Sequence, residues 1–457
     1  MSTVSAISTP FGKGGIAVIR MSGEESVKIL SKVFKPKVKK NIEEYGPNTL
    51  IYGDIYKDGK IIDRGMAVYF RAPRSYTGED SAEIHCHGGI LLSQMVLEAT
   101  FEAGALPAGP GEFTKRAFLS GKMGLSQAES VIDLIDAQSE SKVILAASQT
   151  DGRLSKKTAS VYAQLMTIVS SIYAYIDYPD EDLTDMSVNE MKDSIGKIRD
   201  ELYELKKTYK TGKAICEGLE TVIIGKPNTG KSSLLNMLLG EERAIVTSVA
   251  GTTRDTVEET LSAGRVLLRL CDTAGIRESK DEVEEIGVRR ALEKSENAEL
   301  ILAVFDASSK PDSEDMRVID QIRSYKNKTV IVVLNKTDMG KVLKPLDFAD
   351  VSKHVIYVCA KENTGRSELI KLIEDIYIDG EIEYSSACVV TNARQYSSLC
   401  RTITHIEQAL KTLEEGYTQD IAGMELELAL SELGGLDGRK VTEDVVHNIF
   451  GRFCVGK

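Results

Sequence analysis

Hydrophobic and polar positions divide this 457-residue chain into stretches of different texture. Residues 1–119 carry short β-branched or alternating apolar runs between Gly and Pro clusters, which predict an α+β domain with a helix near 89–103. From 120 to 215, prolines almost vanish and helix formers dominate. Four apolar residues recur there at helical spacing and predict the core-facing stripe of a helix. They are Ile195, Ile198, Leu202 and Leu205.

Residues 216–380 alternate near-continuous apolar runs with helical stretches. The runs are TVIIG, RVLLRLC, LILAVFD, TVIVVLN and HVIYVCA. Strands that are buried on both faces of a parallel sheet have this character, so we predict an α/β domain. Helical texture returns over 381–457. The fold class we expect is therefore α+β multidomain, with the α/β domain inserted between two parts (120–215 and 381–457) of an all-α domain.

Charge and cysteine content narrow the class of protein. The chain has 57 basic and 69 acidic residues, and this net charge of -12 argues against a uniformly basic nucleic-acid binder. Residues 1–119 hold 15 basic and 13 acidic residues, so a local basic patch remains open there. Seven scattered cysteines without a CxxC pair fit a reducing cytoplasm. No apolar stretch is long enough to span a membrane, and the N-terminus lacks a secretory signal.

The strongest motif is GKPNTGKS at Gly225–Ser232, between a predicted strand and a predicted helix. It matches the phosphate-binding loop GxxxxGK[ST], in which backbone amides and a helix N-terminus cradle phosphate oxygens. Lys231 can reach the β- and γ-phosphates, and the Ser232 hydroxyl can ligate magnesium. The predicted contacts with the nucleotide here are Asn228, Thr229, Gly230, Lys231, Ser232 and Ser233.

Motifs after later apolar runs indicate guanine as the base. In DTAG, an aspartate can hold magnesium through water and a glycine amide can touch the γ-phosphate. In NKTD, the carboxylate of Asp338 can pair with two N–H groups of guanine that adenine lacks. Cys359-Ala360-Lys361 resembles an SAK loop, whose backbone amide contacts the guanine oxygen. The predicted GTP contacts are Asp272, Thr273, Ala274, Gly275, Asn335, Lys336, Thr337, Asp338 and Ala360.

Two further segments contain candidate residues for the hydrolysis of bound GTP. The first is AIVTSVAGTTRD, in which Thr252 and Thr253 are candidates for sensing the γ-phosphate and completing a magnesium shell. Its predicted GTP contacts are Thr247, Ser248, Val249, Ala250, Gly251, Thr252 and Thr253. In the second, Ile276 stands where Ras-type enzymes carry a water-orienting glutamine. The acidic stretch Glu278–Gly287 that follows either supplies a carboxylate instead or is a solvated loop.

Four further motifs lie outside the segments that are predicted to bind GTP. They are SYTGED (Ser75–Asp80), HGG (His87–Gly89), PGEFTKRAFLSGK (Pro110–Lys122) and the terminal FCVGK (Phe453–Lys457). With the inserted GTPase domain, they make the chain resemble the MnmE (TrmE) family of tRNA modification GTPases. The resemblance implies a folate-binding and dimerisation domain over 1–119, a helical domain over 120–215 and 381–457, and a Ras-like domain over 216–380.

The resemblance also implies an activity. Members add an aminomethyl or carboxymethylaminomethyl group to C5 of the wobble uridine of certain tRNAs. They act as homodimers with an FAD-dependent MnmG-like partner, in a heterotetramer or larger complex. The one-carbon unit comes from a 5-formyl- or methylene-tetrahydrofolate. GTP hydrolysis depends on potassium and on dimerisation of the GTPase domains.

Site residues follow from the same resemblance. Potassium is expected at Asn228, Thr247, Val249 and Thr252, and magnesium at Ser232 and Thr253. Glu284 matches the catalytic glutamate that positions the attacking water. The folate positions are Arg20, Glu79, Lys122 and Lys457. Cys454 is implied in the modification chemistry, and a partly buried structural cysteine is the alternative.

Other functions stay open at this point. A ribosome-assembly GTPase such as Era or Der shares the phosphate loop, but the C-terminal region is helical and carries no second phosphate loop. A GTP-gated assembly platform whose partner does the chemistry is not separated from direct catalysis. We do not expect metal at His85-Cys86-His87, because alternate residues of a strand point to opposite faces.

Overall fold

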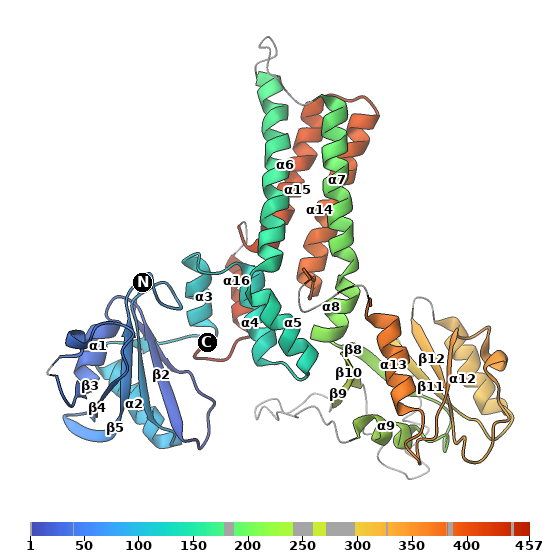
Figure 1. Ribbon diagram of the computed structural model, residues 1–457, viewed down its shortest axis with the longest axis horizontal. Coiled ribbons are helices and arrows are strands. Elements are labelled where there is room, and N and C mark those ends of the chain that lie inside the picture. The colour runs from blue at the N-terminus through green and yellow to red at the C-terminus, as the bar shows by residue number, and fades with distance from the viewer. Residues whose placement is uncertain are drawn as a thin grey trace. The chain divides into compact units, whose positions relative to one another are not determined.

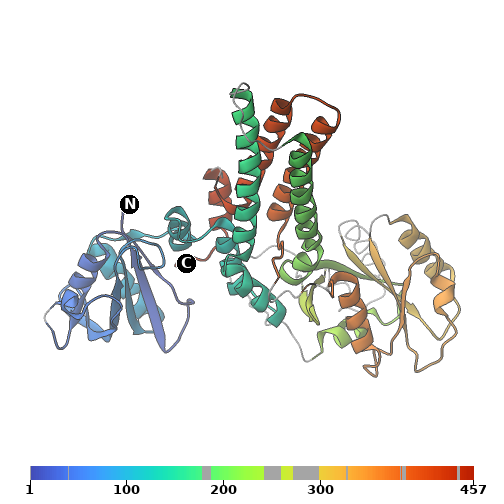
Figure 2. The same cartoon turned by 45° about the horizontal axis from the view of Figure 1, so that its top comes forward.

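In the computed structural model the chain forms two compact units, Met1–Ile132 with Gly434–Lys457 and Asp133–Leu433 (Figures 1 and 2). The structure describes residues 2–39, 41–177, 187–240, 259–270, 298–325, 328–380, 382, 387–439 and 443–457. Within these ranges, no helix combines the length and the apolar composition needed to cross a bilayer.

The first unit contains a mostly antiparallel seven-stranded sheet in the order β3-β4-β5-β6-β2-β1-β7. Its strands are β1 (Val4–Ile7), β2 (Ile16–Ser22), β3 (Phe34–Pro36), β4 (Ile51–Lys57), β5 (Lys60–Phe70), β6 (Ser81–His87) and β7 (Leu106–Pro107). Helices α1 (Ser26–Val33) and α2 (Ile90–Glu102) pack on one face and cover the core. The helix predicted near 89–103 is thus confirmed as α2.

Side chains alternate along β6 as the sequence predicts. Cys86 is buried in the core beneath α1 and α2. His85 and His87 point to the opposite face, where His85 contacts Glu83 at 3.2 Å and His87 contacts Asp63 at 2.8 Å. This face of the sheet therefore carries ionisable pairs rather than a hydrophobic core.

The C-terminal residues complete the first unit. Helices α3 (Glu112–Leu119), α4 (Leu125–Ile135) and α16 (Glu443–Phe450) enclose a small apolar cluster around Phe450 and Phe453. The chain then runs back along the start of α3, where Val455 forms a β-bridge with Pro110. The Phe113 amide donates to the carbonyl of Lys457 (3.1 Å). Both chain termini thus contribute to this unit.

The second unit contains the helical bundle that the sequence predicts. Its helices are α5 (Glu140–Thr150), α6 (Arg153–Asp177), α7 (Val188–Lys207), α8 (Tyr209–Cys216), α14 (Ala393–Glu414) and α15 (Gln419–Asp437). Helices α6, α7, α14 and α15 run side by side (Figures 1 and 2). The predicted stripe of α7 is confirmed, because Ile195, Ile198, Leu202 and Leu205 are all buried, and α7 packs against α14.

In the sequence, an α/β segment with a six-stranded sheet is inserted between α8 and α14, and its strand order is β13-β12-β11-β8-β10-β9. The strands are β8 (Leu219–Ile224), β9 (Glu259–Ala263), β10 (Val266–Leu270), β11 (Leu300–Asp306), β12 (Thr329–Asn335) and β13 (His354–Tyr357). All five predicted strands pair in parallel, and β9 adds an antiparallel edge. Helices α9 (Lys231–Leu239) and α13 (Arg366–Tyr377) cover one face, and α12 (Ser313–Ser324) covers the other.

The chain passes into and out of this α/β part at neighbouring points. The Thr211 hydroxyl on α8 donates to the Tyr377 carbonyl (3.3 Å) and accepts from the Asp379 amide (3.0 Å). Gly212 lies so close to the returning chain that a Cβ there would be 2.1 Å from the Val390 carbonyl oxygen. The two connections are therefore tied together by hydrogen bonds and close packing.

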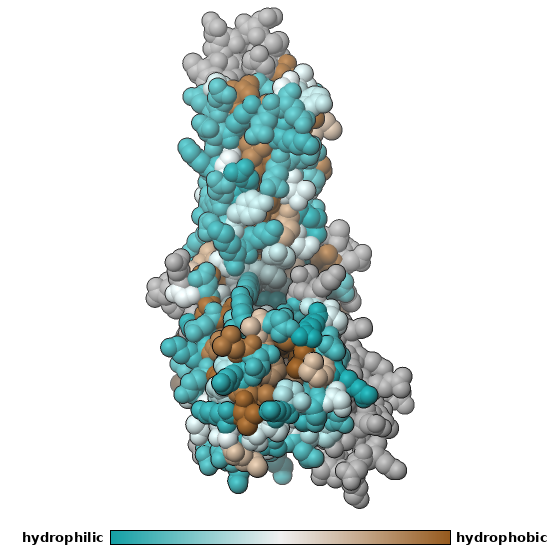
Figure 3. Space-filling model, turned by 90° about the vertical axis from the view of Figure 1, so that its right-hand side faces the viewer, coloured by the Kyte–Doolittle hydropathy of each residue, from teal (hydrophilic) through white to brown (hydrophobic). Residues whose placement is uncertain are grey.

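Figure 3 looks on to the end of the α/β part that carries α12, where apolar side chains gather on the surface. Four large apolar residues of α12 and the segment after β12 are exposed. They are Met316, Met339, Val342 and Leu346.

Candidate functional site

The predicted phosphate loop joins β8 to α9 at the carboxyl edge of the parallel sheet. Asn228 and Gly230 have φ values of 62° and 94°, in the left-handed region that favours Asn and Gly. A Cβ on Gly230 would lie 2.2 Å from the side-chain nitrogen of Asn335. Glycine is therefore required at this position, and the loop turns so that the N-terminus of α9 faces its concave side.

Lys231 folds back over this loop. Its ammonium group donates to the carbonyl oxygens of Gly225 (3.0 Å) and Lys226 (2.8 Å). The Thr229 hydroxyl also donates to the Lys226 carbonyl, at 3.0 Å. The positive charge is thus held at the loop that the sequence predicts to bind phosphate.

The side chain of Asn335 joins three of the predicted segments. Its nitrogen donates to the Thr229 carbonyl in the phosphate loop (2.9 Å), and its oxygen accepts from the Ala360 amide (3.0 Å). Asn335 is only 2% exposed. Because a buried amide left without partners is costly, this contact fixes the loops relative to one another.

Lys336 has a partner that sequence reasoning missed. Its backbone φ is 63°, and its ammonium group lies 2.8 Å from the Asp306 carboxylate at the end of β11. Burial opposes ionisation of Asp306, but hydrogen bonds from Lys336 and Ser308 outweigh it and lower the pKa of this carboxyl. Asp306 could have been selected from the sequence, because it is a carboxylate that ends a buried strand at the edge where the motifs lie.

Asp338 is oriented by the third loop. The Cys359 thiol donates to Asp338 Oδ1 at 3.3 Å, and Cys359 itself is buried. The Thr337 hydroxyl donates to the Val358 carbonyl at 3.2 Å. Asp338, the carboxylate predicted to recognise guanine, is exposed. Its contact with the Cys359 thiol fixes the direction of the carboxylate.

Ser232 and Ser233 lie in the first turn of α9, directly after Lys231. Two other predicted segments of the GTP site lie outside the described residues. Thr247, Ser248, Val249, Ala250, Gly251, Thr252 and Thr253 fall within 241–258, and Asp272, Thr273, Ala274, Gly275, Ile276 and Glu284 fall within 271–297. The potassium and magnesium sites remain predictions for this reason. The structure brings together Thr229, Gly230, Asn335 and Ala360 by the contacts above, and Asn228 and Lys231 belong to the same phosphate loop.

A second candidate site lies in the first unit, around Arg20 on β2. The Arg20 guanidinium pairs with Glu83 (2.9 Å) and lies over the rings of Tyr76 and Phe113, at 5.8 and 5.7 Å from their centroids. Hydrogen bonding from His85 and the charge of Arg20 together outweigh burial and lower the pKa of Glu83. Arg20 is thus held against two aromatic rings.

Glu79 is oriented by an arginine that the sequence analysis overlooked. Glu79 Oε2 accepts from Arg116 (2.9 Å) and from the Ser22 hydroxyl (2.8 Å). Arg116 is 3% exposed and also donates to Glu112 (3.0 Å) and to the carbonyl of Ser2 (3.0 Å). Arginine is mostly exposed in folded proteins, so nothing in the sequence marks Arg116 as buried.

The two predicted lysines of this site lie beside these groups. Lys122 donates to the Pro73 carbonyl (2.7 Å), and its Cγ would be 3.3 Å from a Cβ on Gly78, the neighbour of Glu79. The carbonyl of Lys457 accepts from the amide of Phe113, whose ring lies under Arg20. The four predicted folate residues therefore occupy one region of the first unit.

Cys454 is exposed, and its carbonyl accepts from the Gly111 amide at 3.4 Å. Burial in a core therefore does not explain a cysteine at this position. The thiol lies in the terminal segment that also carries Lys457.

Comparison with known proteins places these sites in a family. Models described as "GTP-binding protein TrmE N-terminus" and "MnmE helical domain" match residues 3–122 and 125–454. A protein named tRNA modification GTPase MnmE, from Clostridioides difficile (strain 630), is 41% identical over 458 residues, covering 100% of this chain and 99% of that protein. The chain belongs to the MnmE family. Another MnmE, from Acetivibrio thermocellus, is 38% identical over 459 residues, with the same coverage.

Solved structures overlap with smaller parts of this MnmE family member. The crystal structure of a point variant of Aquifex aeolicus Era bound to GDP.AlF4- is 27% identical and covers 41% of this chain and 66% of its own, with a TM-score of 0.27. The G domain of the T. maritima FeoB iron transporter is 22% identical and covers 34% of this chain and 97% of its own, with a TM-score of 0.26. At these TM-scores, the MnmE assignment rests on the sequence relatives. It confirms the predicted resemblance.

Proposed function

We propose that this chain hydrolyses GTP to GDP and phosphate and couples hydrolysis to modification of C5 of the tRNA wobble uridine. The single observation that carries the proposal is identity of about 40% along the full chain to proteins named tRNA modification GTPase MnmE. The guanine and phosphate loops, joined by Asn335, support it independently. The product would be an aminomethyl or carboxymethylaminomethyl group, made with an FAD-dependent MnmG-like partner.

The described residues of the nucleotide site would bind the phosphates and the guanine base. Lys231 and the α9 N-terminus would hold the phosphates, and Asp338, oriented by Cys359, would accept from the guanine edge. The hydroxyl, amide and carbonyl oxygens at the predicted metal positions suit hard cations. Magnesium at Ser232 and Thr253, with potassium at Asn228, Thr247, Val249 and Thr252, would neutralise charge that develops on the phosphates. Glu284 would position the attacking water.

In the first unit, Glu79 fits the N–H edge of a pterin. Within the described part of the chain, hydrogen bonds from Arg116 and Ser22 both reach Oε2, so Oε1 is left to accept from a ligand. Arg20, Lys122 and Lys457 would hold the acidic glutamate tail of a tetrahydrofolate derivative. We also propose that this unit mediates homodimerisation and that the protein acts in the cytoplasm.

The deciding experiment is mass spectrometry of tRNA nucleosides from cells that lack this chain. We expect the C5-modified wobble uridines to disappear and to return when the gene is restored. Normal levels of these nucleosides, together with accumulation of immature ribosomal subunits, would instead support a ribosome-assembly GTPase.

A variant of Cys454 distinguishes direct participation in the uridine modification from a role as a GTP-gated assembly platform. Because this thiol is exposed, Cys454→Ser leaves the packing intact. Loss of the modified uridine with normal GTP hydrolysis would support a chemical role for the thiol, and unchanged levels would favour the platform. Cys388→Ser, at a half-buried position away from the described site residues in sequence, is the control.

A further inference from the structure

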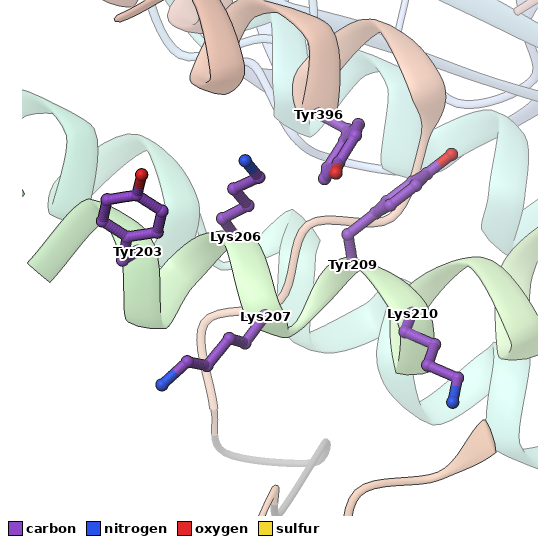
Figure 4. A pocket seen from close by; sticks show the side chains of 6 residues that line it. All are labelled: Tyr203, Lys206, Lys207, Tyr209, Lys210 and Tyr396. Atoms are coloured by element: carbon purple, nitrogen blue, oxygen red, sulfur yellow. The ribbon is translucent and has the colours of Figure 1, made fainter. Parts of the chain in front are cut away.

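A hollow of about 310 Å³ lies in the second unit, where α7 ends, α8 begins and α14 begins (Figure 4). Three lysines and three tyrosines line it, and they come from residues almost 200 positions apart in the chain. They are Tyr203, Lys206, Lys207, Tyr209, Lys210 and Tyr396. None of them belongs to the nucleotide site or to the folate site described above.

Aromatic rings shape one side of the hollow. Tyr209 and Tyr396 stack with their centroids 4.2 Å apart and their planes 19° apart. The Lys206 ammonium lies between Tyr396 and Tyr203, at 5.9 and 5.5 Å from their ring centroids. Figure 4 shows Lys206 among the rings, whereas Lys207 and Lys210 extend away from it. The cations are thus spread around the aromatic surface.

Positive charge is concentrated here although the chain as a whole is acidic. Residues 205–216 contain four lysines and no acidic residue, in a protein of net charge -12. Among the residues that the structure describes, no carboxylate pairs with Lys206 or Lys210. Lys207 pairs with Glu204, but both side chains are well exposed, so this pair is weak. Nearby Glu407 accepts from the Tyr203 hydroxyl.

A structural role accounts for only part of this cluster. Lys206 and Lys207 lie in the last turn of α7, where cations interact favourably with the helix dipole. Lys210, in the first turn of the next helix, donates to the Ile376 carbonyl (2.7 Å) and lies 5.2 Å from the ring centroid of Tyr377, so it also has a structural role. Neither reason explains the tyrosines beside Lys206 and Lys207. Lysines that neutralise phosphates beside rings that face nucleotides are the usual means of binding RNA without reading its sequence.

We propose that this hollow binds the sugar–phosphate backbone of RNA. The proposal rests on the proposed function, which makes tRNA the RNA concerned. Lys206 and Lys207 would contact phosphates, and the tyrosine rings would pack against the nucleotides between them.

The test is fluorescence anisotropy with an unmodified tRNA transcript whose anticodon begins with uridine, titrated with the full chain at several salt concentrations. The test variant is Lys206→Gln with Lys207→Gln. The control is Lys192→Gln with Lys197→Gln, which removes the same charge from the same helix, about 14 Å or more away. Thermal melting checks that both variants fold.

Loss of two phosphate contacts should reduce the slope of log affinity against log salt by about 1.5 and weaken binding roughly ten- to thirtyfold near 0.1 M salt. The control should match the unmodified chain, and excess inorganic phosphate or GTP should not displace the tRNA. Equal loss in both variants, or no loss in the test variant, would overturn the proposal. Absence of tRNA binding by the unmodified chain would also overturn it. In either case the nucleoside analysis would still decide the proposed function on its own.

Discussion

Replacing Arg116 by Met should both destabilise the first unit and abolish its binding of folate. Methionine keeps much of the length of the side chain but removes the guanidinium that contacts Glu79 and Glu112. Two carboxylates then face each other without the buried cation between them. Glu79 also loses one of the two hydrogen bonds that hold its Oε2.

The magnitude follows from burial. Removing one partner of a buried ion pair costs about 3–5 kcal/mol. Glu79 and Glu112 keep 20% and 27% of their side-chain exposure, so water offsets part of this loss and we expect about 3 kcal/mol. For a unit of this size, about 1 kcal/mol corresponds to a change of roughly 2–4 °C in Tm. The Tm of the first unit should therefore fall by roughly 6–12 °C.

Differential scanning calorimetry measures this Tm, and isothermal titration with 5-formyltetrahydrofolate measures binding. Lys115→Met is the matched control, because it removes the same charge from the neighbouring position of α3. GTP turnover by the second unit should stay normal in both variants. If Arg116→Met retained the Tm and the folate affinity of Lys115→Met, the assignment of Arg116 as the residue that positions Glu79 would be wrong.

Four further predictions concern the nucleotide site. Gly230→Ala should weaken GTP binding about tenfold or more, measured by equilibrium titration, because its left-handed backbone costs about 1–2 kcal/mol with a Cβ and the methyl group meets a side-chain amide; normal affinity would contradict this geometry. The lowered pKa of Asp306 means that its pair stabilises the fold above about pH 3.9 and that this gain is lost as pH falls through the folded pKa. Asp306→Asn should therefore flatten the fall in Tm between about pH 5 and 3, and an unchanged slope would argue against it. Glu284→Ala should bind GTP but lose turnover, as followed by phosphate release, and an undiminished rate would remove Glu284 from catalysis. Replacing potassium by sodium should slow hydrolysis sharply, and equal rates in both salts would remove the proposed role of Asn228.

Local pattern was sufficient to predict most strands of the α/β part. The run LILAVFD is strand β11 over its whole length, because a strand covered on both faces is apolar at nearly every position. The edge strand β9 was missed, since Glu259–Ala263 is short and only partly apolar. The pairing of Val4 with Leu106 was also beyond the pattern, because nothing in two short runs a hundred residues apart specifies their register.

A motif that fixes both residue type and spacing was sufficient to select Lys231 and Asp338 as candidates for phosphate and guanine binding, and these roles stay predictions. Sequence reasoning failed where tertiary packing decides. From sequence, Arg116 would be taken as a surface charge, and its burial depends on contacts with Glu79 and the Ser2 carbonyl, which are distant in the chain. Asp306 reads as the end of a strand, and it becomes part of the site only because the neighbouring strand ends beside it.

The paired connections between α8 and the returning chain have a consequence for engineering. Because Thr211 is bonded to residues 377 and 379, and Gly212 touches Val390, the two ends of the inserted segment are already adjacent. A short glycine-rich bridge from the end of α8 to the residues before α14 could therefore replace the whole α/β part without stretching either helix. Such a shortened chain would show which activities of the bundle and the first unit are independent of the nucleotide site.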